Sequence, residues 1–114
     1  MYFTFTTERT FRDKHCNLDK ILHIIENKMI ASEIALNYFC GYRDYSAIPL
    51  HNIESEKVLK EDIDNVLDSF RRYKVRIVFC VERVESDNVL SRNYYDSESI
   101  RGLISEEEFK KINI

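Results

Sequence analysis

The stretch EDIDNVLDSFRRYKVRIVFCVERV, from Glu61 to Val84, contains the two clearest structural patterns of this 114-residue chain. In its first half the apolar side chains recur at helical spacing, which predicts an amphipathic helix from Glu61 to Tyr73. In its second half apolar residues occupy alternate positions, which predicts a strand from Lys74 to Val84. Because Val78 and Cys80 on the other parity are also apolar, we expect both faces of this strand to be covered.

The residues before this stretch predict a strand and one or two helices. Aromatic and β-branched residues favour a strand over residues 2–11. Asn17 is a favoured helix N-cap, and the apolar spacing after it predicts an amphipathic helix to Met29. That helix either continues to Cys40 or restarts with Ser32 as a cap. Residues 42–56 have no sustained period, which predicts the longest loop of the chain.

The residues after this stretch predict a hairpin and a short helix. Residues 85–88 have the composition of a turn, and Val89 to Tyr95 is predicted to return as a partner strand. Ser105 and Glu108 form a capping box, which predicts a last helix from Glu106 to Ile112. We therefore expect one α+β domain over residues 1–114, with a small, mainly antiparallel sheet packed against two or three helices.

Composition and charge indicate a cytoplasmic protein that binds neither membranes nor, on average, nucleic acid. The formal net charge is −3 at pH 7, so the mean field repels polyanions and favours a basic protein partner. The three cysteines are widely spaced, as is usual in a reducing compartment. The first residues lack the pattern of a secretion signal, and the longest apolar runs are well short of the ~20 residues of a membrane span.

The sequence carries none of the common catalytic or cofactor-binding motifs, so we predict no enzyme activity, no metal and no cofactor. The His and Cys residues lack the paired spacing of a zinc site. A Cys-dependent enzyme is a minor alternative. Its best nucleophile is Cys16, which is flanked by Lys14 and His15 before a predicted helix, whereas Cys40 and Cys80 lie in apolar surroundings that raise a thiol pKa.

A dense basic patch supports a second alternative, a small nucleic-acid-binding module. The patch consists of Arg71, Arg72, Lys74 and Arg76, with Tyr73 between them. Cations of this kind contact phosphates while an aromatic ring stacks on a base. The same cations also suit a helix C-terminus, and the acidic stretches on either side disfavour a polyanion.

Acidic and tyrosine residues carry the function that we favour, a non-enzymatic protein-binding inhibitor. Tyrosine anchors and complementary charge give affinity and fast association with a basic partner, such as a toxin or a nuclease. The inhibitor would be of the immunity-protein, antitoxin or phage-inhibitor type. We predict the following partner-binding residues: Tyr42, Tyr45, Glu54, Glu56, Asp62, Asp64, Asp68, Tyr94 and Tyr95.

One short run resembles a known motif. The residues Gly102-Leu103-Ile104-Ser105-Glu106-Glu107-Glu108-Phe109-Lys110 are similar to the second half of the short C-terminal helical motif called SHOCT, which is linked to oligomerisation. The resemblance implies a capped helix here and assigns no functional residue.

Overall fold

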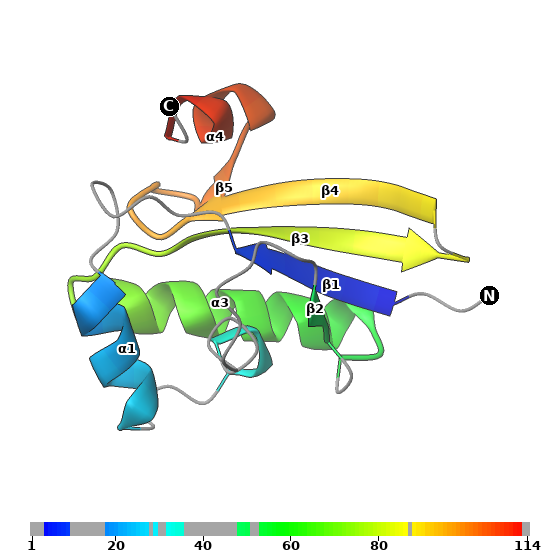
Figure 1. Cartoon of the computed structure of the whole chain (residues 1–114). Coiled ribbons are helices and arrows are strands. Elements are labelled where there is room, and N and C mark those ends of the chain that lie inside the picture. Colours follow the sequence, from blue (N-terminus) through cyan, green and yellow to red (C-terminus); the bar gives the residue numbers. More distant parts are fainter. Residues whose placement is uncertain are drawn as a thin grey trace.

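The structure, a computed structural model, describes residues 4–9, 18–27, 29, 32–35, 48–50, 53–86 and 88–112. These residues confirm the α+β class and the small antiparallel sheet (Figure 1). The elements, in chain order, are β1 (Thr4–Arg9), α1 (Leu18–Glu26), β2 (Ile48–Pro49), α3 (Glu56–Arg72), β3 (Val78–Glu85), β4 (Asn88–Asp96), β5 (Leu103–Ile104) and α4 (Glu106–Ile112).

The five strands form one sheet in the order β2-β1-β3-β4-β5, and each of the pairings is antiparallel. β3 lies in the centre, where Thr6 of β1 is paired with Glu82 and Tyr94 of β4 is paired with Cys80. The helices α1 and α3 lie on one side of the sheet and α4 lies on the other (Figure 1). Both faces of β3 are therefore covered over its first five residues, as its apolar composition predicted.

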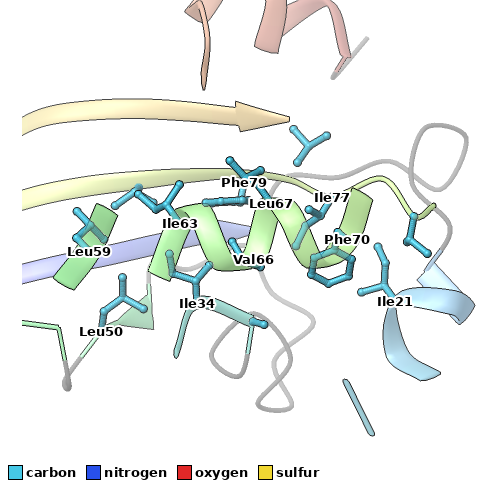
Figure 2. Close-up of a cluster of buried hydrophobic side chains, with 14 of the residues drawn as sticks. Ile21, Ile34, Leu50, Leu59, Ile63, Val66, Leu67, Phe70, Ile77 and Phe79 are labelled. Atoms are coloured by element: carbon cyan, nitrogen blue, oxygen red, sulfur yellow. The ribbon is translucent and has the colours of Figure 1, made fainter. Parts of the chain in front are cut away.

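The hydrophobic core surrounds α3 (Figure 2). Phe70 and Val66 of this helix have no exposed surface, and Phe79 of β3 lies beside Leu67 on the sheet side of the helix. Ile21 of α1 and Ile34 are also fully buried and lie against the other side of α3. Each such side chain contributes roughly 1.5–3 kcal/mol by leaving water. The buried surface of α3 thus spans two sides, and its remaining side is exposed.

The helix α3 begins at Glu56, whereas the sequence pattern placed its start at Glu61. Ser55 is its N-cap and accepts a hydrogen bond from the Val58 N–H at 3.2 Å, which satisfies one of the unpaired donors of the first turn. The predicted start was wrong because Val58 is exposed and the first turn therefore lacks a complete apolar stripe.

The helix α3 ends in a turn that occupies the first residues of the predicted strand. Lys74 adopts a left-handed φ of 56° and donates its N–H to the Arg71 carbonyl, while Val75 donates to the Phe70 carbonyl, both at 3.0 Å. This is a Schellman motif, and Val75 and Phe70 both belong to the buried core. The strand β3 therefore begins at Val78 and not at Lys74.

The N-terminal predictions are confirmed where the structure describes the chain. The predicted first strand is present as β1, and the predicted first helix is present as α1, which ends at Glu26. Of the two alternatives for the following residues, the restart is correct, because Ser32 Oγ accepts the Ala35 N–H at 3.2 Å and residues 33–35 are helical. Asn17 and residues 36–40 lie outside the described residues.

Two short strands were not predicted. β2 lies within the predicted loop and pairs with β1, with its proline in an edge strand, where a missing N–H costs no ladder hydrogen bond. β5 pairs with the end of β4. The predicted hairpin strand and the last helix are confirmed as β4 and α4. The capping box is also present: the Glu108 N–H donates to Ser105 Oγ, and the Ser105 N–H donates to Glu108 Oε1.

Candidate functional site

An exposed row of side chains runs along α3 at intervals of four residues. Glu56, Lys60, Asp64 and Asp68 occupy this row, because residues four apart lie on one side of a helix. The side chains of its three acids are 60, 57 and 69 % exposed, respectively. We call Glu56, Asp64 and Asp68 the acidic row. The sequence prediction placed all three in the partner-binding set.

Each acid of the row contacts one basic side chain of this protein. Arg83 Nη1 lies 2.7 Å from Glu56 Oε1, Lys60 Nζ lies 2.9 Å from Asp64 Oδ2, and Arg71 Nη1 lies 3.3 Å from Asp68 Oδ1. The hydrogen bond from Lys60 to Asp64 raises the lysine pKa, and the charge of Asp64 adds to the rise. The Lys60–Asp64 pair is 77 and 57 % exposed and contributes little to stability, so a partner's cation can replace it at small cost, whereas Arg71 and Arg83 are only 36 and 33 % exposed.

Tyr95 of β4 lies on the same side of the sheet as α3. Its ring stacks on Phe79 at a centroid distance of 5.1 Å, and half of its side chain is buried. Burial is the main cause that raises the Tyr95 pKa, followed by the negative charges of Cys80, Glu56 and Asp64. Glu56 and Asp64 of the acidic row are therefore within electrostatic range of Tyr95.

Other predicted residues lie elsewhere. Asp62 faces the opposite side and accepts hydrogen bonds from Ser32 Oγ, the Glu33 N–H and the Ile34 N–H at 2.9–3.0 Å, which gives it an internal role at the start of the helical residues 33–35. Tyr94 lies on the α4 side of the sheet, where its ring packs on Phe109 at 4.4 Å. Glu54 is exposed just before α3. Tyr42 and Tyr45 lie outside the described residues.

Residues 96–102 form a hydrogen-bonded turn between β4 and β5 that contacts the end of α3. The sequence pattern did not indicate this turn. The Asp96 N–H donates to the Gly102 carbonyl at 2.8 Å, and the Gly102 N–H donates to the Ser99 carbonyl at 3.1 Å. Arg71 of α3 donates to the carbonyls of Ser97 and Ser99, both at 2.8 Å. At the tip, Ile100 is 99 % exposed. We call residues 96–102 the Ile100 turn.

The basic patch is partly used for internal contacts. Arg71 holds the Ile100 turn, and Arg76 forms a bidentate pair with the buried carboxylate of Asp96, with N–O distances of 3.1 and 2.7 Å. Arg72 and Lys74 are exposed. The four cations therefore do not form one continuous surface for phosphates, which weakens the nucleic-acid alternative.

The described residues offer limited means for catalysis. Cys80 is buried, while Cys16 and Cys40 lie outside the described residues. Within the described part of the chain, no group of three or more His, Cys, Asp or Glu side chains could hold a metal ion. An open cavity of about 400 Å³ lies between β4, β5 and the start of α4, and its Arg92 is bonded to the buried Glu82 at 2.8 Å.

Comparisons with protein-family models, curated proteins and solved structures found no match for this chain. The resemblance of residues 102–110 to SHOCT is therefore not supported by a family model. Among the helices that the structure describes, none combines the length and apolarity needed to cross a membrane.

Proposed function

We propose that this protein is a non-enzymatic inhibitor of the immunity-protein, antitoxin or phage-inhibitor type, which neutralises a basic partner protein. The observation that carries the proposal is the acidic row on α3, whose three carboxylates are all more than half exposed. The three carboxylates lie on one side of α3, with Lys60 between Glu56 and Asp64, and this arrangement suits a basic groove or ridge on a folded partner. Tyr95, on the side of the sheet that α3 covers, adds an aromatic side chain.

The present ion pairs of the row are compatible with this function. Lys60 is an exposed, flexible side chain, and Arg71 keeps its two carbonyl contacts when Asp68 is taken by another cation. Partner binding therefore exchanges weak surface pairs and leaves the fold intact. Complementary charge of this kind acts mainly on the association rate and loses strength with salt.

Affinity capture from a lysate of the native host tests the proposal. The tagged protein is incubated with and without nuclease and at low and high salt, and bound proteins are identified by mass spectrometry. The double variant D64N/D68N removes two charges of the row. The control variant E106Q/E107Q removes two exposed charges from α4, on the other side of the sheet (Figure 1).

We expect one basic protein that survives nuclease, is released by high salt, and is retained about tenfold less by D64N/D68N but normally by the control. Equal retention by both variants would contradict the proposal. Loss of the captured material on nuclease treatment would instead favour nucleic-acid binding through Arg72 and Lys74.

A further inference from the structure

Ile100 is exposed to an extent that no other described apolar side chain reaches. It is 99 % exposed, whereas Leu103, the next most exposed large apolar residue of the described chain, is 52 % exposed. Single exposed apolar residues are common, but most of them keep half of their surface against the protein. Ile100 contributes nothing to the core and stands free at the tip of its turn.

The turn that carries Ile100 is held in one conformation from several directions. Ser97 donates its N–H to the Ile77 carbonyl at 3.0 Å, and its Oγ accepts the Ile77 N–H at 2.8 Å. The side chain of Asp96 accepts the Glu98 N–H at 3.0 Å as well as the bidentate Arg76 pair. The turn is therefore bonded to β3, to the residues before β3, and to Arg71 of α3.

Gly102 closes the turn by a close approach to α3. Its φ is +78°, which disfavours other residues, and a Cβ at this position would lie 2.5 Å from Leu67 Cδ1. The base of the turn is thus packed on the helix that carries the acidic row. Arg71 donates hydrogen bonds both to Asp68 of the row and to the carbonyls of Ser97 and Ser99. The acidic row therefore lies next to the turn.

A rigid turn with an exposed aliphatic tip is suited to insertion into a pocket. Most surface side chains lose conformational freedom when they bind, and a preorganised loop has already lost it. Burial of one isoleucine side chain removes apolar surface from water at the centre of an interface, and charged residues around it exclude solvent. Resting on the proposed function, we propose that Ile100 is the apolar anchor that inserts into an aliphatic-lined pocket of the basic partner.

Charge complementarity identifies the kind of pocket. The acidic row reaches the turn at Asp68. Glu98 lies within the turn with a 64 % exposed side chain, 3.5 Å from Arg76 Nε, and the exposed Arg101 is the cation of the turn itself. A partner that accepts Ile100 therefore needs an apolar pocket bordered by basic side chains on the side that faces α3. The row supplies the rim of the interface, and Ile100 supplies its centre.

Site-specific crosslinking beside the tip tests this inference. The photoreactive residue p-benzoylphenylalanine replaces the exposed Arg101, and the full chain is irradiated in the native host lysate. The same label is placed in chains that carry I100S or the control L90S, which shortens another exposed apolar residue, on β4. Because Ile100 buries no surface, I100S is expected to leave the free energy of unfolding unchanged, which urea denaturation checks.

We expect one crosslinked basic protein, a yield about 10- to 100-fold lower with I100S, and an unchanged yield with L90S. If I100S crosslinks as well as the parent chain while D64N/D68N loses the partner, the anchor is refuted and the proposed function stands. If the basic protein is never recovered, both are refuted. A crosslinked product of two copies of this chain would also overturn the anchor.

Discussion

Asp96 is 5 % exposed, and its carboxylate accepts both the Arg76 guanidinium and the Glu98 N–H. The variant D96A leaves the largely buried Arg76 charge without its bidentate partner and frees one end of the Ile100 turn. We expect it to lower the free energy of unfolding by about 3 kcal/mol, measured by urea denaturation.

The matched control is D64A, which removes a carboxylate from an exposed pair with Lys60. We expect D64A to leave stability nearly unchanged, because water replaces that contact. Similar losses of stability in D96A and D64A would show that the contribution of these carboxylates to stability does not depend on their burial.

Tyr95 gives the protein a specific sensitivity to high pH. Burial raises its pKa above the ordinary 10.0, so the folded state holds the phenolic proton more tightly than the unfolded state does. Its contribution is fully present below pH 10 and is lost as the pH rises through the folded-state pKa. We expect stability to fall above about pH 10, with Tyr95 among the last tyrosines to form tyrosinate by absorbance titration.

The variant Y95F keeps the ring that stacks on Phe79 but removes the ionisable hydroxyl. Its loss of stability above pH 10 should be smaller than that of the parent chain. An identical pH profile in the two proteins would assign the effect to other residues.

The connection after α3 and the Ile100 turn each contain a residue with a left-handed backbone conformation. Only one of these two residues is a glycine. Lys74 has a φ of 56° at the C-terminus of α3, and Gly102 has a φ of 78°. We expect K74G to raise the free energy of unfolding by about 1 kcal/mol, because glycine adopts this conformation without steric cost. We expect G102A to lower it by at least ~2 kcal/mol, since it adds both strain and the contact with Leu67.

Thermal unfolding of the two variants measures these opposite effects side by side. A destabilised K74G would indicate that the lysine side chain contributes more than its backbone strain costs. A neutral G102A would require α3 to move away from the turn.

The elements that the sequence predicted well have repeated patterns. α3 and β3 show helical and alternating apolar spacing, and the capping box of Ser105 and Glu108 defines the start of α4. β2 and β5 have two residues each, which is too short for any periodicity, so their formation depends on the strands beside them. The end of α3 was predicted to within one residue, but the turn that follows it was assigned to the strand because the residue that closes the helix is lysine and not glycine.

Part of the candidate site was also predictable, because it lies on a helix with a regular apolar pattern. Asp64 and Asp68 lie on one side of the predicted helix, as their spacing requires, whereas Glu56 joins them only because α3 begins five residues earlier than predicted. The inward contacts of Asp62 depend on the backbone of residues 33 and 34, which lie far away in the sequence. The exposure of Ile100 follows from the hydrogen bonds of its turn, and a local apolar pattern does not show these.

The protection of amides from hydrogen exchange should follow the position of each strand in the whole sheet. β3 has a neighbour on each side and is buried over its first five residues, whereas β5 is a two-residue edge strand. We expect the amides of β3 to exchange last and those of β5 and α4 to exchange early, measured by hydrogen exchange with mass spectrometry. Equal protection of α4 and β3 would contradict this order.

The interior position of β1 has a consequence for how the protein is made. Thr4 of β1 is paired with Val84 of β3, so the ribosome synthesises β1 long before the strand that pairs with it. Until then the edge of nascent β1 that pairs with β3 is open, a state that favours aggregation. The centre of the sheet therefore forms only after β3 has been synthesised, because the pairing of β1 with β3 joins segments that lie far apart in the sequence.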